Sequence, residues 1–213
     1  MSFHHIAIEG PIGVGKSSLV ERLAERLEAT TLLEEWGKNP FLKNFYDGVP
    51  GAAFQVEVFY LLSRYRQQQE LLQRKLFEST TVCDYVLEKC RLFAYLNLDD
   101  SELLIFEKLY GLLTENAPRP DLVIYLQAPT EILMKRIKSR GRSEEAGLSE
   151  EYLAEVNRAY NHYFFHYSQT PLLVVNTTDV DFVKRPEDVD DLLKQVRNMG
   201  KGTQYYVPMA SRG

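Results

Sequence analysis

Eight residues near the amino terminus, Gly10-Pro-Ile-Gly-Val-Gly-Lys-Ser17, combine glycines with a lysine and a hydroxyl side chain. Glycines at this spacing let backbone amides turn inward around phosphate groups, while Lys16 can reach the β- and γ-phosphates and Ser17 can offer its hydroxyl to Mg²⁺. The alternative is a glycine turn before an ordinary helix, but the segment lies between an apolar run and an amphipathic stretch, as a phosphate loop requires. We therefore predict a site for a nucleoside triphosphate, formed by Gly10, Pro11, Ile12, Gly13, Val14, Gly15, Lys16, Ser17 and Ser18.

Carboxylates follow two further apolar runs. Glu34 and Glu35 come directly after residues 30–33, and Asp84 follows residues 80–83. In a parallel sheet these positions lie at the carboxyl-terminal edge, where the glycine loop opens. Phosphoryl transfer to a hydroxyl needs one carboxylate beside the acceptor oxygen and another to hold the metal ion or its waters, and we expect Ser17 and Asp84 to organise Mg²⁺. The alternatives are a solvated glutamate pair and a strand-end cap.

A basic segment, Arg136-Ile-Lys-Ser-Arg-Gly-Arg-Ser143, places three arginines and a lysine at a predicted helix end and in a glycine-containing loop. Guanidinium groups bind phosphate oxygens through paired donors, so this pattern predicts a lid that clamps phosphates. A plain basic surface loop is the alternative.

The elements that must position these side chains follow from hydrophobic periodicity. Five short apolar segments predict strands at residues 3–8, 30–33, 80–83, 122–126 and 172–175. Helical patterns lie between them, including residues 16–28 and a long stripe from 52 to about 77. Strands that alternate with helices indicate an α/β fold with a parallel sheet.

Composition limits the class of protein. With 213 residues and 45% hydrophobic residues, we expect one domain over 1–198 and a polar, loosely held tail over 199–213. A formal net charge of −5 argues against a protein that coats nucleic acid. Cys83 and Cys90 have no disulfide or zinc spacing, and no apolar run is long enough to span a membrane. We therefore expect a cytoplasmic protein without nucleic-acid or membrane partners.

Four segments in order, GPIGVGKSS, EEWGKNPFL, FQVEVFYLLSR and RIKSRGRSEE, resemble the deoxynucleoside kinase family, the salvage enzymes that phosphorylate the 5′-hydroxyl of deoxynucleosides. The resemblance covers about residues 3 to 175, and its last segment is the most specific. It implies a P-loop kinase fold with a five-stranded parallel sheet and an arginine lid, ATP or another triphosphate with Mg²⁺ as donor, and a homodimer packed through helices.

The resemblance also implies roles for individual residues. Glu34 matches the glutamate that takes the 5′-hydroxyl proton, and Arg64 matches an arginine of the base pocket. Tyr46 and Glu145 match the pair that holds the sugar 3′-hydroxyl. The lid arginines, which bind the donor phosphates and the transferring group, correspond to Arg136, Arg140 and Arg142.

The sequence departs from the family pattern beside Asp84, where Tyr85 stands in place of an arginine that supports the 5′ end of the acceptor. Either Lys89 or Arg91, both close in sequence, substitutes for that arginine, or turnover is weak.

Two further departures concern the base pocket. Glu57 replaces the expected glutamine and shares a helix face with Arg64, and Cys90 replaces an aspartate. An ionised carboxylate only accepts hydrogen bonds, so Glu57 suits the adjacent N1–H and N2–H₂ donors of guanine, with Arg64 donating to O6. The alternatives are that Glu57 pairs with Arg64, or that a protonated or tilted carboxylate serves adenine or cytosine.

Other functions compete with a deoxynucleoside kinase. A thymidylate-type monophosphate kinase would share the loop, lid and sheet but needs additional basic residues for the acceptor phosphate. A kinase-like fold that has lost catalysis would act as a binding subunit, and a GTPase would be expected to carry an Asn-Lys-x-Asp motif.

Overall fold

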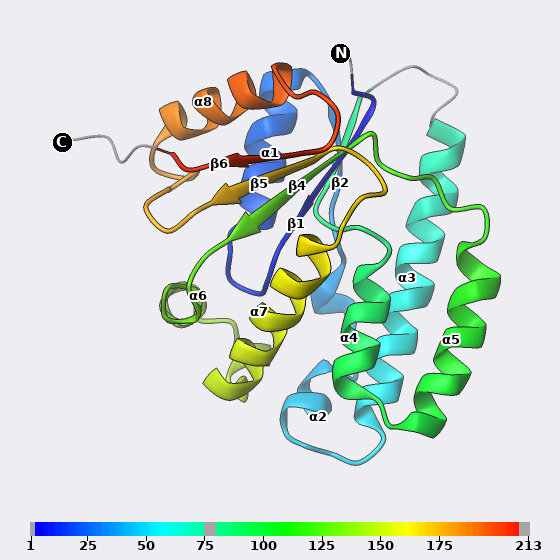
Figure 1. The fold of residues 1–213 in the computed structure, drawn as a ribbon. Helices are drawn as coiled ribbons and strands as arrows, with labels where there is room; N and C mark the ends of the chain where they lie inside the picture. Colours follow the sequence, from blue (N-terminus) through cyan, green and yellow to red (C-terminus); the bar gives the residue numbers. More distant parts are fainter. Residues whose placement is uncertain (1–2, 75–79, 209–213) are drawn as a thin grey trace.

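Short strands form a parallel sheet in the computed structural model, which describes residues 3–74 and 80–208 (Figure 1). The order is β2-β3-β1-β4-β5-β6, and all neighbouring strands are parallel. Most of β4 and β5 is buried, as expected for central strands covered on both faces. The strands are β1 (His5–Glu9), β2 (Thr30–Leu32), β3 (Thr81–Cys83), β4 (Leu122–Gln127), β5 (Leu172–Asn176) and β6 (Thr203–Tyr206).

The prediction of an α/β fold on a parallel sheet is confirmed, but the expected number of five strands is wrong because β6 adds a sixth. This strand lies inside the segment 199–213 that we predicted to be a loosely held tail. Thr203, Gln204 and Tyr205 are exposed, so β6 lacks the apolar pattern of a buried strand and is defined by its pairing with β5.

Helices cover the two faces of the sheet and form separate cores. Ile6 and Ile8 of β1 pack in one core with α1, α6 and α8, whereas Ala7 between them packs in the other with α7. This division arises because successive side chains of a strand point to opposite faces. The α-helices are α1 (Lys16–Leu27), α2 (Leu42–Tyr46), α3 (Ala52–Arg74), α4 (Lys89–Asn97), α5 (Asp100–Thr114), α6 (Thr130–Arg140), α7 (Glu150–Phe165) and α8 (Pro186–Arg197).

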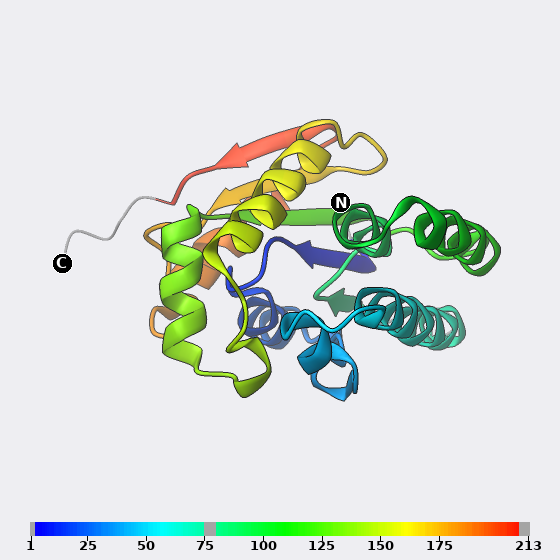
Figure 2. The same ribbon diagram turned by 90° about the horizontal axis from the view of Figure 1, so that it is seen from below.

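Three helices, α3, α4 and α5, pack against one another beside the sheet, and Figure 2 shows α3 and α5 side by side away from β6. Their contacts bury a third cluster, which contains Leu61, Cys90, Ala94 and Phe106. The prediction for α3 extended to about Phe77, but residues 75–79 lie outside the described residues. Within residues 3–74 and 80–208, no helix has both the length and the hydropathy needed to cross a bilayer.

The parallel arrangement brings the ends of three strands together. β1 ends at Glu9 and leads into the glycine loop, β2 ends two residues before Glu34, and β3 ends directly before Asp84. Glu9 is buried and fixes this edge, since it accepts hydrogen bonds from the Gly10 amide, the Val86 amide and the Tyr160 hydroxyl. The predicted phosphate loop and carboxylates therefore meet at one edge of the sheet.

Candidate active site

The glycine loop between β1 and α1 has the conformation of a phosphate cradle. Gly13 has φ 83°, and a Cβ added there would come within 2.9 Å of the Leu133 carbonyl oxygen. Gly15 has φ 103° and caps the amino terminus of α1. Both positions thus require glycine. The amino terminus of α1 presents backbone N–H groups and a partial positive charge, which favour an anion.

Lys16 folds back over this loop, with its Nζ 2.6 Å from the Gly10 carbonyl oxygen and 3.1 Å from that of Pro11. Burial and the nearby Lys89 lower the pKa of Lys16 to about 8, although Glu9, Glu34 and Asp84 act in the opposite direction. The ammonium group is therefore poised to gain a stronger partner when phosphate oxygens replace the two carbonyls.

Ser17 and Asp84, which we expect to organise Mg²⁺, are in direct contact. The Ser17 hydroxyl donates to Asp84 Oδ2 over 2.9 Å, and the Glu34 amide donates to Oδ1 over 2.7 Å. A hydroxyl and a carboxylate are hard oxygen ligands of the kind that Mg²⁺ takes beside phosphate groups, so this pair fits the predicted metal site. Asp84 also fixes the backbone of Glu34, which ties the metal side of the site to the acceptor side.

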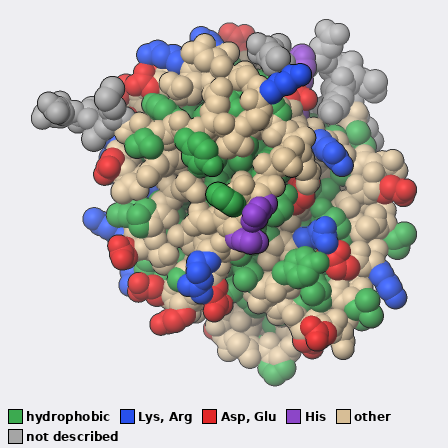
Figure 3. Space-filling model, in the orientation of Figure 1, with side chains coloured by type: hydrophobic (Ala, Val, Ile, Leu, Met, Phe, Trp, Pro, Cys, Tyr) green, Lys and Arg blue, Asp and Glu red, His purple; other side chains and the backbone are tan. Residues whose placement is uncertain are grey.

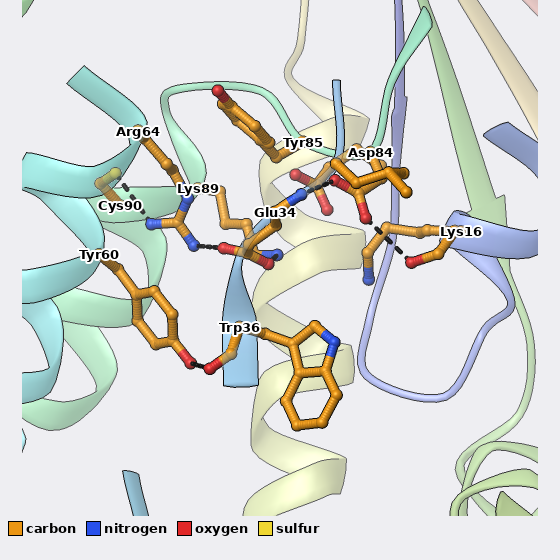
Figure 4. Close-up of polar contacts among 12 residues, drawn as sticks. Lys16, Glu34, Trp36, Tyr60, Arg64, Asp84, Tyr85, Lys89 and Cys90 are labelled. Atoms are coloured by element: carbon orange, nitrogen blue, oxygen red, sulfur yellow. Dashed lines mark hydrogen bonds and ion pairs between the residues drawn. The ribbon is translucent and has the colours of Figure 1, made fainter. Parts of the chain in front are cut away.

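Glu34 lies between two cations, and Figure 4 shows Arg64 and Lys89 converging on its carboxylate. Arg64 of α3 pairs with Oε1, and Lys89 of α4 donates to Oε2 over 2.8 Å. Burial alone would raise the pKa of Glu34, but Arg64 and Lys89 outweigh it and lower the pKa to about 2. The neighbouring Glu35 instead pairs with Lys38 at the surface over 2.5 Å. Of the two glutamates, the structure thus places Glu34 in the site.

Tyr85 stands beside Asp84, where the family pattern has an arginine. Tyr85 is buried and receives a hydrogen bond from Gln68 over 3.2 Å. The Arg64 guanidinium carbon lies 5.8 Å from the centroid of the Tyr85 ring and 5.1 Å from that of Tyr60. Of the two substitutes that the sequence suggested, Lys89 reaches the cavity, whereas Arg91 pairs with Glu107 on the surface over 2.8 Å.

Glu57 and Arg64 both line the far end of the cavity, but they have different partners. Asn97 donates to Glu57 Oε1 over 2.8 Å, while Arg64 donates to Glu34 and to the Cys90 sulfur. Arg64 therefore pairs with Glu34, not with Glu57, among the described residues. Burial raises the pKa of Glu57 to about 7, although Asn97 and Arg64 partly oppose the shift. Cys90 is fully buried and accepts a hydrogen bond of 3.1 Å from Arg64, which lines the cavity.

The end of α6 and the lid segment that follows it bring three predicted residues to the cavity, Arg140, Arg142 and Glu145. Arg140 donates to both carboxylate oxygens of Glu145 over 2.6 Å, and Arg142 lies 3.8 Å from Glu145. Tyr46 of α2 lies near Glu145. Burial is the main cause that raises the pKa of the Tyr46 hydroxyl, and the negative charge of Glu145 raises it further. The third arginine, Arg136, is placed elsewhere, because it donates to the carbonyl oxygens of Val14, Thr177 and Val180.

These side chains enclose a cavity of about 210 Å³ between the P-loop, α3, α4 and the lid. Most of the predicted residues line it, and the exceptions are Gly10, Pro11, Val14, Cys90 and Arg136. Helix α4 contributes three lining residues, Lys89, Phe93 and Asn97. The sequence suggested Lys89 only as a substitute for the family arginine, and it did not suggest Phe93 or Asn97. The i, i+4, i+8 spacing of the three puts them on one helix face, a signal that the sequence does contain. The other unassigned lining residues include Trp36, Leu42, Phe45, Val56, Tyr60 and Tyr152.

Comparisons with known proteins agree with this geometry. The family model for deoxynucleoside kinase matches residues 6–200. A deoxyguanosine kinase of Bacillus subtilis (strain 168) is 33% identical over 199 residues, which cover 91% of this chain and 96% of that protein. A deoxyadenosine kinase of Lactobacillus acidophilus is 30% identical over 205 residues, with 90% and 94% covered.

Among solved structures, a deoxyadenosine kinase from M. mycoides with bound dATP aligns with a TM-score of 0.74 and 24% identity, over 90% of this chain and 98% of that one. This likeness shows the shared fold. Because the family model matches nearly the whole chain, and because a relative at 33% identity is covered almost end to end, the protein belongs to the deoxynucleoside kinase family of phosphotransferases.

Proposed function

We propose that the protein transfers the γ-phosphate of ATP, or of another nucleoside triphosphate, to the 5′-hydroxyl of a deoxynucleoside and releases the monophosphate. The observation that carries this proposal is the position of Glu34. Its carboxylate is held by Arg64 and Lys89 in the cavity that the P-loop residues Lys16 and Ser17 also line. A carboxylate at the junction of a triphosphate site and a nucleoside-sized cavity can orient the attacking hydroxyl and take its proton.

The donor side follows from the loop and the lid. Loop amides and Lys16 would bind the phosphates, and Arg140 and Arg142 would stabilise the charge that spreads over the transferring group. Ser17 and Asp84 would hold Mg²⁺, which when bound neutralises charge on the phosphate oxygens. Arg136 fits a different task from the one first expected of it, since it links the P-loop to the segment after β5.

The acceptor side supports a deoxynucleoside. Tyr46 and Glu145 line the cavity near the lid, where they would bind the sugar 3′-hydroxyl, and Glu57 lies with Arg64 and Asn97 among the residues that would receive the base. Asn97 occupies one oxygen of Glu57, which leaves the other to accept hydrogen bonds from guanine. We favour deoxyguanosine, in keeping with the substrate named for the B. subtilis relative. Deoxyadenosine, named for the L. acidophilus relative, is the purine alternative.

A turnover screen tests this function. The protein with Mg²⁺ and ATP is assayed with each of the four deoxynucleosides, and with dTMP to detect a monophosphate kinase. We expect purine deoxynucleosides, and deoxyguanosine above the others, to be phosphorylated. An enzyme that turns over only dTMP would refute the proposal. Preference for a pyrimidine deoxynucleoside would refute the assignment of the base but not of the reaction.

We also propose that the protein works as a homodimer in the cytoplasm. Large hydrophobic side chains are exposed on the helices beside the sheet, namely Tyr95 of α4, Leu104, Ile105 and Leu112 of α5, and Phe165 of α7. Figure 3 shows hydrophobic side chains between charged ones over the face that carries these helices. Both cysteines are free and buried, as suits a reducing compartment. Light scattering should give twice the chain mass, and Leu112→Glu should produce monomers if this face is the interface.

A further inference from the structure

The lid is held across the cavity by a contact with Trp36, the only tryptophan in the chain. The guanidinium carbon of Arg142 lies 3.6 Å from the centroid of the Trp36 ring, and both residues line the cavity. At that separation the planar guanidinium must lie roughly flat on the indole, because an N–H pointing at the ring would hold the carbon farther away. The contact thus joins the segment after β2 to the segment after α6.

The backbone of Trp36 is held without help from the lid. It begins the short helix η1 (Trp36–Lys38), and its carbonyl oxygen accepts a hydrogen bond of 3.0 Å from the Tyr60 hydroxyl of α3 (Figure 4). Two residues earlier, the Glu34 amide is held by Asp84. The backbone that carries the indole is therefore held by α3 and by the end of β3, and the ring lies against Arg142.

The two cavity arginines of the lid are held in different ways. Arg140 donates from Nη2 to both oxygens of Glu145 over 2.6 Å, whereas the distance from Arg142 Nη1 to Glu145 is 3.8 Å. The carboxylate thus occupies one of the Arg140 nitrogens that a phosphate would need. An aromatic face instead contacts the flat side of the guanidinium and leaves the donors in its plane available.

We propose that Trp36 is a positioning residue that preorganises Arg142 for the phosphate oxygens of the donor. This inference rests on the proposed kinase function and adds to it a residue that acts through Arg142. An arginine that is ordered before binding loses less conformational freedom when the lid engages phosphate, so the effect should appear in donor use. Loss of the platform should lower kcat/KM for ATP by roughly three- to thirtyfold, the range of a cation–π contact.

A double-mutant cycle tests the coupling. The values of kcat and of KM for ATP are measured for W36F, W36L, R142A and W36L/R142A at a saturating concentration of the preferred deoxynucleoside. W36F should keep most of the activity because it keeps an aromatic face. The double variant W36L/R142A should have a kcat/KM for ATP close to that of R142A alone, since the platform has no effect without Arg142. The matched control is R140A, whose loss should multiply with that of W36L. The proposal would be overturned if the fold-loss of kcat/KM in W36L/R142A equals the product of the losses in W36L and R142A, or if W36L has wild-type activity.

Fluorescence provides a measurement that needs no turnover. As the sole tryptophan, Trp36 reports its own contact with Arg142. R142A should change the emission of the ligand-free protein and remove most of the response to Mg-ATP, and R140A should leave the ligand-free emission close to that of the wild type. Identical emission from R142A and the wild type would overturn the proposal, even if W36L fails to fold. A wild type that binds ATP with this response but phosphorylates no deoxynucleoside would refute the proposed function alone.

Discussion

Lys89 and Glu34 form a 2.8 Å ion pair in the cavity that the P-loop, α3 and α4 line. Arg64 holds the other carboxylate oxygen, so Glu34 remains ionised at any pH at which the enzyme would be assayed. A carboxylate flanked by two cations is a weak base in the ground state. It can orient the hydroxyl and accept the proton late, as bonding to phosphorus increases the acidity of the attacking oxygen.

Replacement of Glu34 with Gln should lower kcat by roughly 10²- to 10⁴-fold, the range for loss of a general base. Affinity for ATP, measured by calorimetry, should change little, because the P-loop remains intact. Glu35→Gln is the matched control and should retain activity, since Glu35 pairs with Lys38 at the surface. Equal rates for Glu34→Gln and Glu35→Gln would contradict the assignment.

Replacement of Lys89 with Met should lower kcat by roughly 10²-fold, since a cation beside the reacting groups is lost from a buried site. Arg91 is two residues away and pairs with Glu107, so Arg91→Met should stay within about threefold of the wild type. Steady-state kinetics on the two variants distinguish an effect of Lys89 at the site from an effect of removing any positive charge from α4. If Arg91→Met lowers kcat more than Lys89→Met does, the assignment of Lys89 as the cation beside the reacting groups is wrong.

The pKa of Lys16, lowered to about 8 by burial and by Lys89, predicts a basic limb in the pH profile. The charged form binds phosphate, and a lowered pKa means that this form is lost as pH rises through about 8 in the free enzyme. The kcat/KM for ATP should therefore fall above pH 8. In Lys89→Met the limb should move to higher pH, because one cause of the shift is removed. An unchanged limb in that variant would exclude coupling between the two lysines.

The titration of Glu57 predicts a base preference that depends on pH. Burial raises its pKa to about 7, so the carboxylate is mostly protonated below that pH and mostly ionised above it. The ionised form accepts hydrogen bonds from guanine, whereas the protonated form can donate to N1 of adenine. The ratio of kcat/KM for deoxyguanosine to that for deoxyadenosine should rise from pH 6 to pH 8. Glu57→Gln should remove this pH dependence, and a ratio that falls with pH would contradict the role.

The sequence predicts much of the fold because its signals are local. Strands β1 to β5 are short runs that alternate with helical patterns, and they lie within one or two residues of the predicted positions. The phosphate loop is also predictable from local sequence, because its glycines adopt positive φ angles that other residues rarely adopt. β6 was missed because an exposed edge strand is defined by its partner, and nothing in the sequence TQYY alone identifies that partner.

The site was predicted less completely, for reasons of geometry. Spacing along α3 showed that Glu57 and Arg64 share a helix face, but it could not show that Arg64 reaches across to Glu34. The choice between Lys89 and Arg91 depended on which side of α4 faces the cavity. Arg136 belongs to the lid motif, yet its side chain turns to the carbonyl groups of the segment after β5.

The sixth strand has a practical consequence for anyone who shortens this chain. β6 covers the open side of β5, whose N–H and C=O groups would otherwise face solvent along the sequence LLVVN. A chain that stops at residue 198 would keep every residue of the cavity and would still be expected to bind nucleotides. It would also present an unprotected aliphatic strand to its neighbours, and such edges pair with one another. We therefore expect strand β6 to protect the protein against self-association through the edge of β5.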